Sequence, residues 1–515
     1  MNHSVSFRKI TFGRLLPILC LLLLYMFSRM YHLLALPPFI DESIHIQWAS
    51  DVYRGRFLTG AENGRLLALW WIALFQLSGD GVLWVTRTAT LLVCLINVAL
   101  LYSLGKTLVS RFAGILAASL YILAPFALFY DRITMPDSYV GTFGLLSLWF
   151  CVRYIRQNRA FDGVLAGIAL TAGILAKAQG VMLIVIPALA IGLLIPLRPR
   201  SHWRTLARGL ALAYGGFLLT WGPLYVYMIR RGYNYFGVAT TYVGTAKVAG
   251  FAERIITNLQ IAVQIDAGYF SVGLLALLAL LTVYLIVRRW RIGLCLTACV
   301  ILPLIMLFAF TNVVRARYDA FHVPLLILLL AVGLGTLALD LQRQGGVLRS
   351  LAVPGVVAVI VLWALLVALP FQTAMHSDPS AAAMPAEDRI EYVSADSSGF
   401  ALNKVATYLL DNATTNPKPL RVIGLVSNCS GLDLSIPDRR NVTVECPYIN
   451  FNGSEQPKIA ALVNQRGAER PAFDLWIVSE NVPYISLDGI TIPYDPIITF
   501  DRPDGVSHVT LYHAR

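Results

Sequence analysis

The stretch Phe112–Tyr130 reads FAGILAASLYILAPFALFY and carries no charged side chain over its whole length. Three other stretches have the same character: Leu91–Leu104, Leu210–Met228 and Val272–Val287. A helix that crosses the hydrocarbon of a bilayer needs roughly 20 mostly apolar residues, and fewer when its ends are buried in protein. The sequence therefore predicts an α-helical polytopic membrane protein.

The composition agrees with this class and divides the charge unevenly. The chain has 515 residues, of which 57% are hydrophobic and 14% charged, whereas soluble domains are nearer to 25% charged. Residues 1–370 hold 30 Lys and Arg against 12 Asp and Glu, while residues 371–515 hold 11 against 17. Basic residues that flank membrane spans on the cytoplasmic side explain this excess better than nucleic-acid binding does.

About eleven spans are expected. Basic residues precede the first apolar run, Leu15–Phe27, which we interpret as a retained span with a cytoplasmic N-terminus. The short apolar segment Leu66–Phe75 is interpreted as an interfacial helix. The remaining spans are expected near residues 82–104, 112–130, 138–153, 163–177, 180–196, 207–229, 270–287, 292–311, 320–339 and 351–370.

This arrangement predicts a multi-pass protein of the cell membrane with its C-terminal part outside the cytoplasm. The expected inner turns are almost purely basic, whereas ten of the twelve acids of the membrane part fall on the outer side. A face of mixed charge next to the bilayer suits a charged lipid headgroup, although solvated loop charges would also account for many of these residues.

The chain is expected to divide into a transmembrane domain, 1–370, and an extracytoplasmic domain, 371–515. Helical and strand patterns alternate in the second part, which predicts a small α/β domain. Helices are expected at 402–410 and 458–465, and strands at 420–426, 474–478 and 508–513. Cys429 and Cys446, the two cysteines of this part, could form a disulfide or remain free thiols.

The first motif that carries chemistry is Pro37-Pro38-Phe39-Ile40-Asp41-Glu42-Ser43-Ile44-His45, directly after the first span. Two adjacent carboxylates beside a bilayer are costly, so a role beyond structure is favoured. A carboxylate at this place could accept a proton from an acceptor hydroxyl as a general base. The alternative is a helix N-terminus, where acids are favoured by the helix dipole.

A second outer segment, Tyr130-Asp131-Arg132-Ile133-Thr134-Met135-Pro136-Asp137, adds two acids and an arginine. Four basic residues are expected on the same side: Arg65, Lys177, Arg315 and Arg317. Lys177 ends a short span, where an ionisable residue is a functional candidate unless it only reaches the membrane surface.

These pieces together resemble the GT-C membrane glycosyltransferases, in the branch of the protein O-mannosyltransferases and the aminoarabinose transferase of lipid A (glycosyltransferase family 39). The matching pieces, in chain order, are Asp41-Glu42, Asn63-Gly64-Arg65 to Trp70-Trp71, Asp137, Gly173-Ile174-Leu175-Ala176-Lys177 and Arg317-Tyr318 followed by Pro324. The resemblance covers roughly residues 10–330, and its order and sidedness are more specific than any single motif.

The resemblance implies roles for individual residues. Asp41 matches the catalytic carboxylate, Glu42 its supporting neighbour, and Asp137 the acid of the second outer loop. The residues expected to bind the donor phosphate are Arg65, Lys177, Arg317, Tyr318 and Arg132. Asn63-Gly64-Arg65 departs from the lipid A branch, in which an acidic-basic pair stands, and this casts doubt on that branch's substrate and metal site.

The donor is expected to be a sugar on a polyprenyl phosphate. The chain has no Walker loop, no glycine-rich nucleotide fingerprint and no His/Cys spacing for zinc. No cofactor is expected, and a divalent metal is left open. The predicted function is an inverting glycosyltransferase with an extracytoplasmic acceptor: a protein, lipid or glycan. The alternative is a polytopic transporter or lipid flippase, against which the missing repeat and the outer position of the charges argue.

Overall fold

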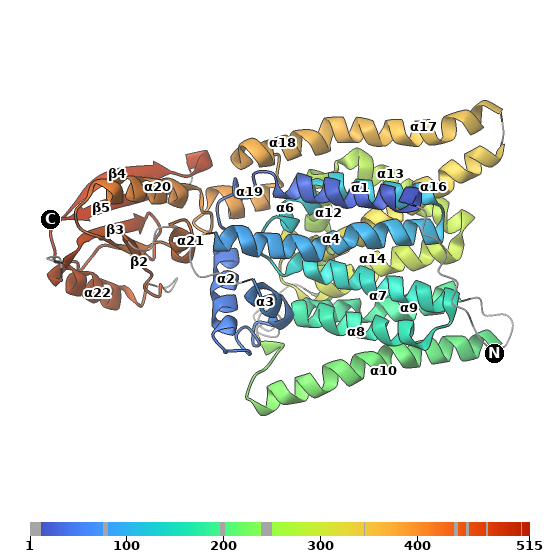
Figure 1. Cartoon of the computed structure of the whole chain (residues 1–515), viewed down its shortest axis with the longest axis horizontal. Coiled ribbons are helices and arrows are strands. Elements are labelled where there is room, and N and C mark those ends of the chain that lie inside the picture. The colour runs from blue at the N-terminus through green and yellow to red at the C-terminus, as the bar shows by residue number, and fades with distance from the viewer. Residues whose placement is uncertain are drawn as a thin grey trace.

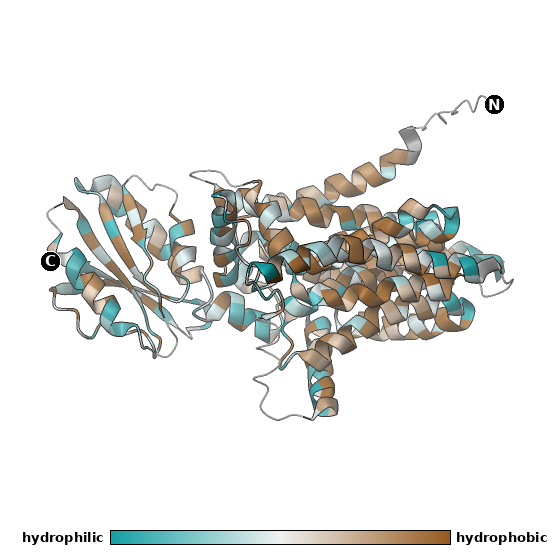
Figure 2. Cartoon of the chain, turned by 90° about the horizontal axis from the view of Figure 1, so that it is seen from below, coloured by the Kyte–Doolittle hydropathy of each residue, from teal (hydrophilic) through white to brown (hydrophobic). Residues whose placement is uncertain are grey.

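The protein consists of a long bundle of apolar helices with a smaller domain at one end (Figure 1). The computed structural model describes residues 12–75, 81–195, 201–237, 250–344, 346–436, 441–449, 453–469, 472–505 and 507–515. The N-terminal basic residues Arg8 and Lys9 lie outside these ranges. The hydropathy colouring shows apolar residues along the bundle and mixed residues in the smaller domain (Figure 2).

The bundle contains a helix at every expected span. Its helices are α1 (Phe12–Met30), α2 (Ile40–Tyr53), α3 (Leu66–Ala73), α4 (Val82–Leu108), α5 (Arg111–Leu123), α6 (Pro125–Asp131), α7 (Asp137–Gln157), α8 (Ala160–Ala176), η1 (Ala178–Ile184), α9 (Val185–Leu194), α10 (Ser201–Arg230), α12 (Phe251–Phe270), α13 (Val272–Arg288), α14 (Trp290–Phe310), α15 (Ala316–Asp319), η2 (Ala320–His322), α16 (Val323–Gln344) and α17 (Gly346–Trp363).

Length and composition qualify fewer helices as spans than the sequence predicts. Five described helices are long and apolar enough to cross a membrane, or seven when each of two bent pairs counts as one span. The bends are 61° between α5 and α6 and 110° between α12 and α13. Helices α8 and α9 are shorter than a full crossing. A multi-pass membrane protein is therefore supported, and the number eleven stays a prediction.

The charged residues expected on the two sides of the membrane gather at opposite ends of the bundle. At the end away from the smaller domain, Arg153 pairs with Asp162 at 3.3 Å, and Arg288 pairs with Asp340 at 3.0 Å. The acids and bases of the expected outer loops meet at the other end, beside the smaller domain. This division agrees with two faces of different charge, and the assignment of one end to the outside stays a prediction.

The smaller domain is a five-stranded mixed sheet with helices, as the alternating pattern predicts. The strands are β1 (Leu420–Leu425), β2 (Val442–Glu445), β3 (Asp474–Glu480), β4 (Tyr494–Asp501) and β5 (His508–Ala514), in the order β2-β1-β3-β5-β4. The first three strands are parallel, and β5 is antiparallel to both β3 and β4. Helices α20 (Phe400–Thr415), α21 (Cys429–Leu434) and α22 (Gln456–Ala468) accompany the parallel strands. Cys429 and Cys446 form a disulfide.

A short helical segment joins the two parts. Helix α17 continues through the π-helical turn η3 (Ala364–Ala368) into α18 (Leu369–Ser377), so the division expected at residue 370 falls within helical structure and remains a prediction. The segment then forms η4 (Pro379–Ala381), α19 (Ala386–Arg389) and η5 (Ile390–Ser394). These turns carry acidic side chains to the end of the bundle that lies beside the smaller domain.

The smaller domain packs directly on the start of α2. Asn428 donates a side-chain hydrogen bond to the carbonyl of Pro38 at 2.9 Å, and the amide of Ile40 donates to the carbonyl of Ser397 at 3.1 Å. A Cβ atom at Gly399 would lie 2.6 Å from the Pro38 carbonyl oxygen, so this approach requires glycine. Helix α2, which carries Asp41, is thus held both by the segment that joins the two parts and by the smaller domain, called the tail domain below.

Candidate functional site

The N-terminus of α2 separates the two carboxylates of the Asp41-Glu42 pair. Pro37 and Pro38 keep the chain extended up to Phe39, whose backbone is also extended, and the helix begins at Ile40. Successive residues of a helix point about 100° apart, so neighbouring side chains take different partners. Here Asp41 is directed toward a cavity, whereas Glu42 is buried in the bundle.

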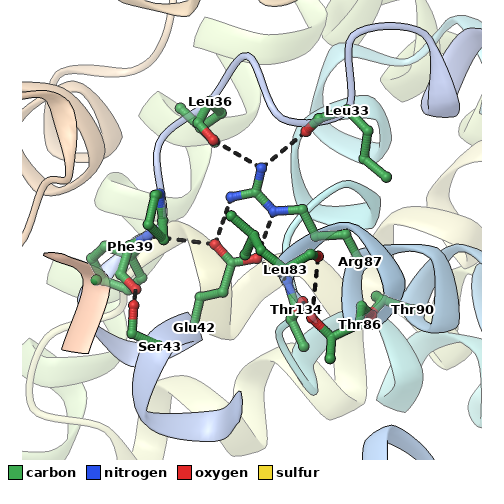
Figure 3. A network of polar contacts seen from close by, with 12 residues as sticks. Leu33, Leu36, Phe39, Glu42, Ser43, Leu83, Thr86, Arg87, Thr90 and Thr134 are labelled. Carbon is green, nitrogen blue, oxygen red and sulfur yellow. Dashed lines mark hydrogen bonds and ion pairs between the residues drawn. The ribbon is translucent and has the colours of Figure 1, made fainter. Parts of the chain in front are cut away.

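Glu42 forms a buried ion pair with Arg87 of α4 (Figure 3). Arg87 donates from Nε to Oε1 at 2.8 Å and from Nη2 to Oε2 at 2.7 Å, and the amide of Thr134 donates to Oε1 at 2.7 Å. The Nη1 atom of Arg87 donates to the carbonyls of Leu33 and Leu36. Every oxygen of Glu42 is therefore occupied, and the pair fixes α2 against α4. Sequence reasoning missed Arg87, because the apolar residues around it in the chain do not show that it pairs with Glu42.

Asp41 pairs with Arg317 of α15. Nη1 of Arg317 lies 2.7 Å from Oδ2 of Asp41 and 3.0 Å from Oε1 of Glu391 on η5. These three residues line a cavity of about 390 Å³. The other lining residues are Phe39, Ile40, Arg315, Glu387, Ile390, Ala395, Asp396, Ser397 and Ser427. The cavity therefore lies between one end of the bundle, the joining segment and the smaller domain.

The smaller domain contributes Ser427 to the lining of this cavity, and a network of polar contacts behind the lining holds Ser427 in place. Ser427 donates to Oδ2 of Asp396 at 3.0 Å and shares a hydrogen bond of 2.7 Å with the hydroxyl of Tyr484. Glu480 accepts from the amide of Ser427 at 2.9 Å and pairs with the buried Arg502 at 2.5 Å. None of these residues carries a signal in the sequence, because their meeting depends on how the two parts dock.

Asp137 and Lys177 form a second ion pair close to the first. Asp137 begins α7, Lys177 follows the last residue of α8, and both side chains are almost fully buried. The ammonium of Lys177 also lies 4.6 Å from the ring centroid of Tyr318, the residue next to Arg317. Burial of both charges needs this pairing, since an unpaired buried ion is strongly destabilising.

Arg65 lies beside His45 rather than against a carboxylate. Its Nη1 contacts Nε2 of His45, and its guanidinium lies 6.0 Å from the ring of Trp48. Burial, with the positive charge of Arg65, holds the pKa of His45 well below its usual range. Asp41, His45 and Trp48 have the i, i+4, i+7 spacing of one helix face, which was a signal for His45 that sequence reasoning passed over.

Gly64 explains the Asn63-Gly64-Arg65 motif. Its φ is +63°, and a Cβ atom there would lie 2.4 Å from the Cβ atom of Ala178. The Gly64 carbonyl accepts from the Ala178 amide at 2.7 Å. A side chain at this position would push apart the Arg65 loop and the residues after Lys177.

Arg132 lies apart from the other predicted phosphate ligands. It is 2% exposed and donates to backbone carbonyls after α1 and in α18, namely those of Tyr31, His32 and Met375. Because these carbonyls occupy both terminal nitrogens of its guanidinium, Arg132 links α18 to the segment that follows α1. The structure thus brings Asp41, Arg317 and Tyr318 together with the Asp137–Lys177 pair, and turns Glu42 and Arg132 to other partners.

One group of residues has the composition of a metal site. The side chains of Asp266, Asp319 and His322 lie together where α12, α15 and η2 meet. However, Nε2 of His322 faces Asp266 at 3.2 Å while Nδ1 faces Asp319 at 3.2 Å. The two ring nitrogens of His322 thus face two different carboxylates. This arrangement fits a protonated histidine between two acids better than a site in which all three side chains bind one metal ion.

Comparison with known proteins finds a family model that matches part of the chain and solved structures with a similar fold. Residues 65–225 match the family model described as dolichyl-phosphate-mannose-protein mannosyltransferase. A search of curated protein sequences finds no match. The chain is similar to ArnT from Cupriavidus metallidurans in the apo state, with a TM-score of 0.58, 16% identity and coverage of 97% of both chains.

Two further structures share the fold. ArnT from the same organism bound to undecaprenyl phosphate has a TM-score of 0.56 at 16% identity, with coverage of 97% of this chain and 98% of that one. The oligosaccharyltransferase of Archaeoglobus fulgidus tethered with an acceptor peptide has a TM-score of 0.51 at 11% identity, with coverage of 92% and 69%. At these identities the likeness establishes the fold that the sequence motifs predict.

Proposed function

We propose that this chain, a GT-C membrane glycosyltransferase by fold and family model, is an inverting enzyme that uses a polyprenyl-phosphate-linked sugar as donor. Its acceptor would lie outside the cytoplasm. The observation that carries the proposal is the pairing of Asp41 with Arg317 in a cavity at one end of an apolar bundle. A base and a phosphate-binding cation are thereby held side by side.

The reaction would be a single displacement. Asp41 accepts the proton of an acceptor hydroxyl, whose oxygen forms the new bond to the anomeric carbon. The bond from that carbon to the phosphate oxygen breaks, and the polyprenyl phosphate leaves with the electron pair. Arg317 stabilises the charge that develops on the leaving phosphate, because a guanidinium can donate two parallel hydrogen bonds to phosphate oxygens.

Asp137, Lys177 and Arg65 would support the donor half of the site. Lys177 adds a positive charge that Asp137 holds in place and that the Tyr318 ring covers. Arg65 is anchored through His45 and Trp48, so within the described part of the chain its guanidinium is held without a neutralising carboxylate. A cation held this way keeps its charge available to a phosphate.

The fold relatives support a lipid-phosphate donor and an acceptor that is a separate molecule. ArnT has been solved with undecaprenyl phosphate, and the archaeal oligosaccharyltransferase with an acceptor peptide. We further propose eleven spans, a cytoplasmic N-terminus and an extracytoplasmic tail domain, which places the cavity next to the outer leaflet. The polar wall of Asp396, Ser397 and Ser427 would then face the acceptor.

Mass spectrometry of the cell envelope tests this function while the sugar is still unidentified. Glycans, glycolipids and glycoproteins are compared between cells that lack the protein, cells with the wild-type chain, and cells with Asp41→Asn. One hexose- or pentose-sized modification should disappear in the deletion and return only with the wild type. Identical envelope profiles in all three strains would exclude the proposed function.

A further inference from the structure

The carboxylate of Glu391 bridges the two arginines of the cavity. Its Oε1 lies 3.0 Å from Nη1 of Arg317, and its Oε2 lies 3.5 Å from Nη1 of Arg315. The Glu391 side chain is 9% exposed, and among the described residues Oε2 has no hydrogen-bond partner. The Glu391 carboxylate therefore offers one oxygen to each guanidinium group, as a bound phosphate would do.

The charges of the cavity wall leave no surplus for an incoming anion. Arg315 and Arg317 are balanced by Asp41 and Glu391, and Glu387 and Asp396 add two further carboxylates to the lining. Arg317 meets both of its carboxylates through Nη1, while its Nε has no hydrogen-bond partner in the described part of the chain. A phosphate can therefore gain strong contacts here only when a carboxylate gives way.

We propose that Glu391 occupies the place of the donor phosphate when no donor is bound, and that Arg315 and Arg317 together bind the phosphate once Glu391 is displaced. This inference rests on the proposed function. Glu391 is then a positioning residue, which holds both cations ready and competes with the ligand for them. Asp41 is the less suitable group to move, because it is fixed on the first turn of α2.

Displacement of Glu391 would also affect helix α2, which carries Asp41. The hydroxyl of Ser397 donates to the Glu391 carbonyl at 2.6 Å, and the Ser397 carbonyl accepts from the amide of Ile40. The turn that carries Glu391 is thus linked through one residue to the start of α2, next to Asp41. Donor binding would in this way be coupled to the contact between the membrane part and the tail domain.

Binding of undecaprenyl phosphate to the purified full-length protein in lipid nanodiscs tests the proposal. Glu391→Gln keeps the shape and removes the competing charge, so the affinity should rise by roughly tenfold. Glu391→Asp restores the charge and should bring the affinity back toward that of the wild type. Arg315→Gln should lower the affinity by roughly tenfold, because one of the two cations is lost.

Glu387→Gln is the matched control. Glu387 belongs to the same segment and lines the same cavity, but no ion pair joins it to either arginine in the described structure. Because the charge of Glu387 acts on Arg315 and Arg317 without a direct contact, the affinity of Glu387→Gln for the lipid phosphate should rise by only about twofold, well below the rise expected of Glu391→Gln. In the transfer assay, Glu391→Gln should lower KM for the lipid donor and also lower kcat, since the released phosphate is no longer displaced by Glu391.

The outcomes separate the inference from the function on which it rests. If the wild type binds undecaprenyl phosphate and Glu391→Gln binds it equally or more weakly, the proposal that Glu391 occupies the phosphate site is overturned. Unchanged binding by Arg315→Gln overturns the paired-arginine site even where Glu391→Gln fails to fold. If the wild-type protein does not bind undecaprenyl phosphate at all, the lipid-phosphate donor itself is refuted.

Discussion

At the scale of single residues, the two neighbouring acids of α2 have different tasks. Asp41 lines the cavity with a partly exposed side chain, whereas Glu42 is fully buried against Arg87. The sequence places both acids correctly at the end of the first span but cannot distinguish them, because adjacent residues look alike until their partners are known. Glu391 and Arg87 escape prediction for the same reason, because each acquires meaning from a residue distant in the chain, whereas the helical spacing of His45 from Asp41 was a signal that could have been read.

Asp41→Asn tests the residue that we assign as the base. The amide keeps the size of the side chain and removes its basicity, so turnover should fall by roughly 100-fold or more. The melting temperature of the purified protein should stay near that of the wild type. Asp51→Asn on the same helix, whose partner Arg56 is exposed, is the control and should transfer normally. Near-normal transfer by Asp41→Asn would refute the assignment.

At the scale of elements, short helices and turns place the site while long helices provide the frame. Hydrophobic patterning predicts where the apolar helices lie, because an apolar run of this length has few alternatives, while the number of helices that cross the membrane stays a prediction. The same patterning overlooks the break at Ala124 within the span expected near 112–130, and it overlooks α12, which bends by 110° into α13 at Ser271. In the tail, the predicted helices and strands are confirmed, but β2 and β4 escape prediction, because short or half-exposed strands leave little periodic signal.

The Glu42–Arg87 pair should stabilise the junction of α2 and α4. Arg87→Leu leaves the Glu42 carboxylate buried without its cation, and we expect a loss of about 3–5 kcal/mol. The double variant Glu42→Gln/Arg87→Leu should melt at a higher temperature than Arg87→Leu alone, since it buries no unpaired charge. Differential scanning fluorimetry in one detergent makes the comparison. A double variant as unstable as the single one would contradict the role given to this pair.

Asp388 predicts how stability depends on pH. Burial raises the pKa of Asp388 to about 7, while the hydroxyls of Tyr130 and Tyr269 donate to its carboxylate. The folded state therefore retains a proton that the unfolded chain releases near pH ~4, so stability falls as the pH rises from about 4 to about 7. Asp388→Asn should show a smaller loss of melting temperature between about pH 4.5 and about pH 7.5.

The control for this comparison is Asp378→Asn, at an exposed residue whose carboxylate accepts only from Ser380 among the described contacts. It should follow the wild-type pH profile. An Asp388→Asn profile that coincides with the wild type would mean that this carboxyl is not the group responsible.

At the scale of the whole molecule, the site lies where three parts of the chain meet. The bundle supplies Asp41 and Arg317, the joining segment supplies Glu391, and the tail domain supplies Ser427. Sequence motifs identify the contribution of the bundle, because those residues follow spans in a recognisable order. The contributions of the joining segment and of the tail could not be predicted, since docking of two domains leaves no periodic trace in either.

Orientation can be tested by the accessibility of a single engineered cysteine. Tyr448 is 75% exposed in the tail domain, and Tyr448→Cys should react in intact cells with a membrane-impermeant maleimide. Wild-type protein is the control for the native cysteines, four of the five free ones being buried. Reaction only after lysis would place the tail domain inside and would contradict extracytoplasmic chemistry.

The central claim is that the leaving group of the reaction is a lipid phosphate that is bound by Arg317. It is tested most directly in a reconstituted assay that offers a polyprenyl-phosphate sugar and a sugar nucleotide separately to wild type, Arg317→Ala and Arg317→Lys. We predict transfer from the lipid donor only, with KM raised and kcat lowered in Arg317→Ala and partial rescue by Arg317→Lys, which lacks the paired geometry. Transfer from the sugar nucleotide in lipid-free detergent, unaffected by Arg317→Ala, would contradict both the donor and the site.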